Sequence, residues 1–347
     1  MKKSLFTLAA LSAFAAGAYA QSSVTLFGVV DAAVRQVKNG SAGSMKQLAS
    51  GSNATSRWGL RGVEDLGGGL RAGFHLESGI GVDAGTTDAK FWGRRSTVSL
   101  IGGFGEIRLG RDYAPTEWNT YFEPFGAVGV GSSGIFTYGA GASLGSPVGT
   151  APASTLRKDN SIGYFLPAMG GVYGQAMVSA GEGIDGNKYI GGRIGYAAGP
   201  IDVAVAVGNT DLVSGTDFKQ SNVMFNYNFG FAKLHTFYDV KKWSPRQQKV
   251  LSVGATVPMG AGVFKLALAN ADRSGGAVGS GFGDADDSRL MAVGYEHNLS
   301  KRSALYTTYS RVTNKGAARS SVVYSAPAGM LGGETSTGLE LGVRHRF

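Results

Sequence analysis

Hydrophobic and polar residues alternate along most of the chain, which is the pattern of β-strands whose two faces meet different surroundings. The alternation divides into sixteen segments, most of them close to the ~9–11 residues with which a tilted strand crosses a bilayer. An even number of strands returns both ends of the chain to one side. The predicted strands are 24–37, 54–66, 70–82, 91–101, 106–112, 156–166, 172–182, 188–197, 201–208, 218–229, 232–242, 247–257, 263–271, 287–298, 303–314 and 336–347.

The connections between these strands alternate in length. Short turns marked by glycine or proline occur, for example, at 102–105 and 198–200. Longer polar segments such as 38–53 and 315–335 lie between the short turns. Short turns at one rim and long loops at the other are typical of outer-membrane barrels. We therefore predict an all-β protein that forms a 16-stranded antiparallel transmembrane β-barrel.

The polar face of the strands carries too many charges for a dry core. Residues such as Val205 and Leu266 form the apolar face, and the other face carries Arg57, Arg61, Arg71, Glu77, Asp202 and Lys265. A soluble β-sandwich is the alternative, but it turns its apolar face inward and buries charges only in pairs. We expect the charged face to line a water-filled lumen, and the apolar face to meet lipid or a neighbouring subunit.

The first twenty residues have the features of a secretory signal peptide. Lys2 and Lys3 precede an apolar stretch at 5–16, and Ala18 to Ala20 provide small residues where a signal peptidase cuts. We expect residues 21–347 to form the exported protein, as one barrel domain. Beyond residue 20, no uninterrupted apolar run reaches the ~20 residues of a spanning helix.

The composition agrees with a chain of short strands and turns. The 56 glycines and only 9 prolines argue against a helical protein and against disordered low complexity. The chain has no cysteine, so disulfides contribute nothing. Removal of Lys2 and Lys3 lowers the formal charge from +9 to +7. This excess favours anions as partners, and nucleic acid is not an expected partner of an exported chain.

The segment 338–347 alternates up to Phe347. Leu339, Leu341 and Val343 share one face with this terminal aromatic residue. Such a strand leaves an edge that must be paired. We expect it to pair with the N-terminal strand and so close the barrel.

Several segments resemble the Gram-negative general porins, especially the trimeric sixteen-stranded porins of β-proteobacteria. They are SSVTLFGVVDAAV at 22–34, SRWGLRGVEDLGGGLRAGFHLESG at 56–79, GEIRLGRDY at 105–113, RKDNSIGYFLP at 157–167 and the final Phe347. The resemblance covers essentially all of the mature chain. It implies a homotrimer in the outer membrane, in contact with lipid and lipopolysaccharide. It also implies passive diffusion of small hydrophilic solutes through three parallel pores, each narrowed by a long third loop.

The resemblance also identifies candidate residues of the pore constriction. Arg57 and Arg157 match constriction arginines, and Glu77 lies at the matching place in the third strand, where it would orient them. Arg94 matches a third arginine, whereas strict alternation turns Arg95 inward instead. A β-bulge could re-aim either side chain, so both remain candidates. Arg61 is a further inward candidate, with Arg71 and Arg108.

The longest connection, 113–156, corresponds to the third loop. Its sequence Glu123-Pro124-Phe125-Gly126 resembles the tip of the porin third loop with the first two residues transposed. From 124 to 156 the loop contains no Asp or Glu, so Glu117 and Glu123 are the loop acids available to the constriction. Guanidinium groups stay charged and present forks of donors, so an arginine wall without balancing acids should favour small anions.

Other polar residues indicate no cofactor. The four histidines lie on different predicted strands without metal-ligand spacing. Asp284, Asp286 and Asp287 could bind calcium or bridge lipopolysaccharide phosphates, but a solvated acidic loop is the simpler interpretation.

We considered three functions other than a general pore. A barrel hydrolase would need a close acid and histidine, but His235 and Asp239 are about 13 Å apart along one strand. An adhesin or a substrate-specific channel remains open on sequence grounds, and transport measurements separate the latter from a general porin.

Overall fold

The computed structural model describes residues 23–126, 128–137, 156–183, 188–211, 217–323 and 329–347. These residues form one sheet of eighteen antiparallel strands that closes on itself. The strands are β1 Ser23–Asn39, β2 Ser44–Ser50, β3 Arg57–Gly67, β4 Leu70–Gly81, β5 Thr86–Thr87, β6 Arg95–Gly102, β7 Gly105–Tyr113, β8 Arg157–Phe165, β9 Val172–Ser179, β10 Tyr189–Ala198, β11 Ile201–Asp211, β12 Asp217–Asn228, β13 Lys233–Trp243, β14 Arg246–Met259, β15 Gly262–Ser274, β16 Ser288–Asn298, β17 Ser303–Asn314 and β18 Thr335–Arg346.

Sixteen of these strands make the barrel wall, as the alternation predicts. β5 has two residues and pairs with the end of β4. β2 pairs with β1 beyond the point where β3 begins. Both therefore belong to the loops, and the remaining strands correspond one to one to the predicted segments. Among the described residues, no helix is long and apolar enough to cross a membrane.

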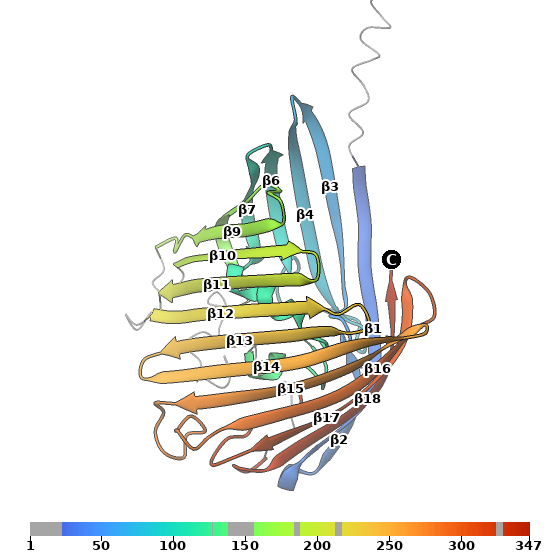
Figure 1. The fold of residues 1–347 in the computed structure, drawn as a ribbon, viewed down its shortest axis with the longest axis vertical. Helices are drawn as coiled ribbons and strands as arrows, with labels where there is room; N and C mark the ends of the chain where they lie inside the picture. The colour runs from blue at the N-terminus through green and yellow to red at the C-terminus, as the bar shows by residue number, and fades with distance from the viewer. Residues whose placement is uncertain (1–22, 127, 138–155, 184–187, 212–216, 324–328) are drawn as a thin grey trace, which may run out of the picture.

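The barrel closes through β1 and β18, which lie side by side in Figure 1 although they stand at opposite ends of the sequence. Residues from Val29↔Arg346 to Asn39↔Ser336 are paired. The backbone N–H of Phe347 donates to Gly28 O at 3.1 Å, and Gly28 N–H donates to Phe347 O at 3.0 Å. A Cβ on Gly28 would lie 2.3 Å from the ring atom Cζ of Phe347, so glycine leaves the space that this ring occupies.

The two faces of the wall differ as the alternation predicts. Val205, Val207, Leu266 and Leu268 are 44–60% exposed on the outer face. Between them, Ala204, Ala206 and Ala267 turn inward and are buried. The outer face is therefore the apolar one, which suits a lipid surrounding.

Deletion of Phe347 should reduce the amount of folded barrel far more than it changes the pore of the molecules that do fold. The deletion removes two backbone hydrogen bonds and a ring contact at the closing seam. The measurement is the yield of heat-modifiable barrel on semi-native gels, with Phe347→Tyr as the control that keeps the ring. A normal yield from the deletion variant would contradict this prediction.

Candidate pore constriction

The third loop folds into the barrel and is anchored first to the wall near β10–β12. Its helix η2, Pro115–Phe122, contacts these strands on the inside. The Asn119 side chain donates to Asn222 Oδ1 at 2.8 Å and accepts from Arg193 Nε at 2.6 Å. The Asn222 amide also donates to the carbonyl of Thr116 at 2.9 Å. These contacts fix the start of the loop inside the lumen.

The loop is anchored a second time farther round the wall. Phe136, on the short helix α2 (Gly134–Thr137), is fully buried in a cluster with Val130 and Ile135 of the loop. Gln248 Nε2 donates to the carbonyl of Phe136 at 2.7 Å, and the Lys241 ammonium donates to the carbonyl of Thr137. The wall and loop partners in this apolar cluster are Val37, Val250, Ala269, Ala271, Leu290, Val312, Val322 and Val323. The loop therefore runs across the lumen between its two anchors.

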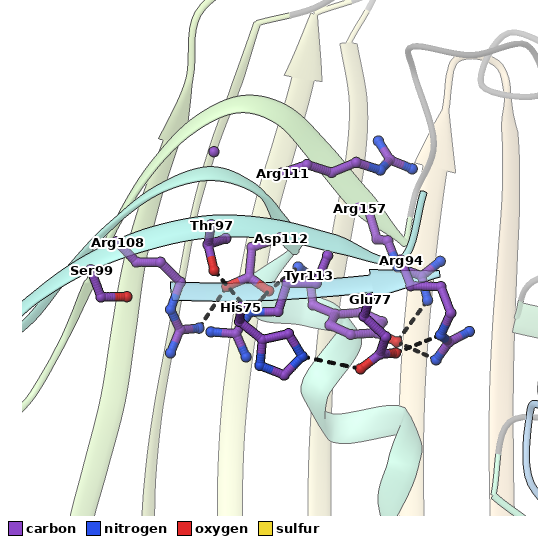
Figure 2. A network of polar contacts seen from close by, with 12 residues as sticks. His75, Glu77, Arg94, Thr97, Ser99, Arg108, Arg111, Asp112, Tyr113 and Arg157 are labelled. Carbon is purple, nitrogen blue, oxygen red and sulfur yellow. Dashed lines mark hydrogen bonds and ion pairs between the residues drawn. The ribbon is translucent and has the colours of Figure 1, made fainter. Parts of the chain in front are cut away.

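Three arginines gather on the wall near the start of the loop. Glu77 on β4 accepts a hydrogen bond from Arg94 Nε at 2.5 Å, and Arg57 Nε lies 3.7 Å from the same oxygen. The other carboxylate oxygen lies 3.2 Å from His75 Nε2. Figure 2 shows His75 and Arg94 on either side of this carboxylate. Glu77 thus separates and orients its basic neighbours.

Tyr113 joins the third arginine to this group. Its hydroxyl accepts hydrogen bonds from Arg94 Nη2 at 2.9 Å and from Arg157 Nη2 at 2.6 Å. The Arg157 guanidinium also lies 4.3 Å from the centre of the Tyr113 ring, within cation–π distance. We refer to Arg57, Glu77, Arg94, Tyr113 and Arg157 as the constriction cluster. It has three positive charges and one negative charge.

Both Arg94 and Arg95 turn toward the lumen. Gly93 N–H donates to the carbonyl of Lys90, and Arg94 N–H donates to the carbonyl of Glu77. This turn precedes β6, so the strand begins at Arg95 and not at residue 91 as predicted from the alternation. Arg94 lies before the strand, so the alternation of strand residues does not apply to it. Arg94 can therefore face the lumen together with Arg95.

Arg95 belongs to a second group, whose charges balance. Its Nε lies 3.5 Å from Asp112 Oδ1, and Arg108 Nη1 bonds the other oxygen of Asp112 at 2.6 Å. Arg108 Nε also bonds Glu106 at 2.9 Å. Two arginines thus meet two carboxylates. Arg61, another sequence candidate, has its guanidinium 5.2 Å from the centre of the Phe27 ring and lines a space of about 210 Å³ together with Arg95 and Glu106.

The two candidate acids of the loop are bonded within the loop itself. Glu117 is 2% exposed and accepts a hydrogen bond from the Thr120 hydroxyl at 3.1 Å. Glu123 accepts from the backbone N–H of Ser133 at 3.3 Å and from the hydroxyl of the same residue. Burial raises the pKa of Glu123 to about 7. Both carboxylates thus accept hydrogen bonds from hydroxyl groups of the loop; part of the acid-free stretch, 138–155, lies outside the described residues.

Tyr121 and Val128 form the loop side of the opening. They line a space of about 360 Å³ together with Arg57, Arg94 and Arg95. Tyr121 is 39% exposed, and its ring contacts that of Tyr113 at 5.6 Å between centres. Neither tyrosine is a sequence candidate. The sequence does place Tyr113 at the end of a strand that contains arginines. Its contacts with Tyr121, Arg94 and Arg157 are visible only once the loop is folded.

The site is rich in guanidinium donors. Guanidinium donors face an uncharged aromatic and aliphatic wall, and arginine does not lose its charge at any physiological pH. His235 bonds Thr256 at 3.1 Å, whereas Asp239 accepts from Gln220 at 2.8 Å, so these two residues form no catalytic pair. No group of three or more metal-ligating side chains occurs within the described ranges.

Comparisons with known proteins place this barrel in a family. The family model described as Gram-negative porin matches residues 7–317. Outer membrane porin protein 32 of Delftia acidovorans is 38% identical over the full length of both chains, and an outer membrane porin protein of Bordetella pertussis is 28% identical, also over both full lengths. The solved structure titled anion-selective porin from Comamonas acidovorans superposes with a TM-score of 0.82 at 35% identity, covering 94% of this chain and 100% of that one. A closed sixteen-strand wall, a loop crossing its lumen and full-length similarity to such channels together mean that this chain belongs to the Gram-negative porin family and forms a non-enzymatic channel in the outer membrane.

Proposed function

We propose that this porin conducts small anions in preference to cations, and that the constriction cluster sets this preference. The observation that supports it most is the charge of that cluster, in which Arg57, Arg94 and Arg157 outnumber Glu77. The loop side offers Tyr121 and Val128, and the carboxylates of Glu117 and Glu123 accept hydrogen bonds within the loop. The structure titled anion-selective porin, which is 35% identical, supports the same preference.

The cluster attracts anions through guanidinium N–H groups that are not held in short ion pairs. The Arg57 side chain is 30% exposed, and its contact with Glu77 is long at 3.7 Å. A chloride, carboxylate or phosphate that enters the opening therefore meets the Arg57 guanidinium without competing for a tight salt bridge. The second group, with Arg95 and Arg108, adds no net charge because Asp112 and Glu106 balance it.

A planar-bilayer recording under a KCl gradient tests the proposal directly. The sign of the zero-current potential should show that chloride is more permeant than potassium. Cation preference in the unmodified protein would reject the proposed role of the cluster, while the family assignment would stand.

Replacing Glu77 with Gln should increase the preference for chloride. The change raises the net charge of the constriction cluster by one, and a unit charge at about 4 Å in water is worth about 1 kcal/mol, or roughly a fivefold change in a permeability ratio. The measurement is the same zero-current potential at low salt. Glu64→Gln, on the exposed end of β3, is the matched control. A shift toward potassium would show that Glu77 acts mainly by holding the arginines in place.

The assembly and maturation of the protein are also proposals. We propose that residues 1–20 are removed as a signal peptide, that the barrels associate as a homotrimer through part of the apolar outer face, and that lipid and lipopolysaccharide cover the remainder. The exposed apolar side chains of the wall support this arrangement. N-terminal sequencing of the purified protein tests the cleavage. Cross-linking or native mass measurement tests the trimer, and monomers alone in mild detergent would reject it.

A further inference from the structure

The chain between β2 and β3 folds around one carboxylate, that of Asp31 on β1. Asp31 is fully buried. Its Oδ1 accepts a hydrogen bond from the backbone N–H of Ser52 at 2.9 Å, and its Oδ2 accepts from those of Asn53 at 3.2 Å and Ala54 at 3.0 Å. Three consecutive backbone N–H groups therefore point at the same carboxylate, which is a strong acceptor for such donors.

The backbone of Asp31 bonds both ends of the same stretch. Its carbonyl accepts from the Gly51 N–H at 2.9 Å and from the Ser56 hydroxyl at 2.9 Å, and its N–H donates to that hydroxyl at 3.0 Å. Asp31 thus contacts the start, the middle and the end of residues 51–56, which we call the first-loop segment.

The first-loop segment leads directly into Arg57 of the constriction cluster. Arg57 Nη1 donates to the carbonyl of Thr55 at 2.9 Å, whereas Arg57 Nε lies 3.7 Å from Glu77. The contact with Thr55 is the shorter of the two, so the segment orients the guanidinium more closely than Glu77 does. Asn53 and Ala54 line the same space of about 360 Å³ as Arg57. The segment therefore forms an edge of the opening.

The third loop packs against the same segment. A Cβ on Gly129, whose φ is +86°, would lie 2.2 Å from the carbonyl oxygen of Ser52. The two backbones thus meet with no room for a side chain. The Ser52 hydroxyl also accepts from Arg35 Nη2 at 2.5 Å, and Arg35 is paired with Glu340 at 2.9 Å. Val128, which lines the opening, precedes this contact by one residue, so the segment supports the loop side of the opening as well.

The wall around Asp31 is held by backbone pairing. Backbone hydrogen bonds join β1 to β18 along one edge and to β3 along the other. The side chain of Asp31 bonds instead the first-loop segment and, at 2.6 Å, the hydroxyl of Tyr306 on β17. Loss of the carboxylate should therefore release the segment and leave the wall closed.

We propose that Asp31 is a positioning residue of the constriction, which holds the first-loop segment inside the lumen so that Arg57 and the third loop lie where anions pass. This inference rests on the anion preference proposed above, and it assigns part of that preference to a buried residue that the ion does not touch. The expected effect is opposite in sign to that of charge. A carboxylate near the pore repels anions, so its removal by charge alone would raise the chloride preference or leave it unchanged, whereas release of Arg57 lowers it.

Zero-current potentials of Asp31→Ala and Ser56→Ala porins in a KCl gradient at low salt test the proposal. In each variant the chloride-to-potassium permeability ratio should fall severalfold, toward the roughly fivefold loss expected when one unit charge about 4 Å from the ion is withdrawn. Ser56→Ala changes no charge and removes the hydrogen bonds at the end of the segment, so it measures position alone. The yield of heat-modifiable barrel should stay close to normal, and if Asp31→Ala does not fold, the result for Ser56→Ala decides.

A double-mutant cycle with Arg57→Ser shows whether Asp31 acts through Arg57. Arg57→Ser removes the guanidinium that the segment orients, so Asp31→Ala should have a much smaller effect in that background than in the unmodified porin. Asp202→Asn is the matched control, because it neutralises a carboxylate on the lumen face of β11 while its amide oxygen can still accept from the Tyr173 hydroxyl. The control should not lower the permeability ratio.

Two results would overturn the proposal. One is an unchanged or higher chloride preference in the folded variants, and the other is an equal effect of Asp31→Ala with and without Arg57. Cation preference in the unmodified porin would instead reject the anion preference. The coupling between Asp31 and Arg57 would still measure the positioning role in that case, because the cycle does not depend on the sign of the preference.

Discussion

Replacing Arg57 and Arg157 with serine should abolish the anion preference of the pore and shift its zero-current potential toward cation preference. The two changes lower the net charge of the constriction cluster from +2 to zero, and they leave Arg94 paired with Glu77 at 2.5 Å. At about 0.1 M salt we expect the chloride-to-potassium permeability ratio to fall by roughly thirtyfold, given about 1 kcal/mol for each of the two unit charges near the ion.

The salt dependence and a matched control make this result specific. The Debye screening length falls from about 10 Å at 0.1 M salt to about 3 Å at 1 M. The difference in zero-current potential between the variant and the unmodified protein should therefore shrink at high salt. Arg289→Ser, Arg311→Ser removes the same charge from exposed positions on the outer face of β16 and β17 and should leave the potential unchanged. An unaltered potential in the Arg57, Arg157 variant would show that another part of the lumen selects the ion.

The barrel could be predicted from the sequence because each strand alternates in the same simple way. Membrane-facing residues such as Val205 and Leu268 and the glycine-rich turns repeat the same signal along the chain. Charged residues of the wall such as Arg57 and Glu77 could be predicted for the same reason, because they lie within regular strands. The prediction from the alternation was wrong at the start of β6, which begins at Arg95 and not at residue 91. The turn at Gly93 precedes the strand and lets both Arg94 and Arg95 face inward.

The loop side of the constriction could not be predicted in the same way. A loop has no periodicity, so the sequence shows which acids it contains but not where they point. Glu117 and Glu123 were candidates by composition, yet each bonds a hydroxyl of the loop itself. Tyr121 faces the arginines because η2 and α2 are fixed to two separate parts of the wall, and those anchors depend on residues such as Asn222 and Val250 that lie far away in the sequence.

The distal anchor of the third loop should control the width of the pore. We expect Phe136→Ala to give a larger and noisier single-channel conductance from a barrel that is still folded. Phe136 is fully buried between the loop and the wall, and truncation of a buried phenylalanine costs about 3–5 kcal/mol. The remaining hydrogen bonds from Lys241 and Gln248 to the loop carbonyls contribute about 1 kcal/mol each, which does not offset that loss.

Anion preference should fall together with the rise in conductance, because both depend on where the loop lies. When Tyr121 and Val128 move away from the arginines, potassium can pass at a distance where water and salt screen the guanidinium charges. Phe229→Ala, which truncates an exposed ring in the short turn between β12 and β13, is the control and should change neither property. Unchanged conductance in a folded Phe136→Ala porin would show that the anchor at Asn119 and Asn222 holds the loop by itself, and the width of the opening would then depend on η2 alone.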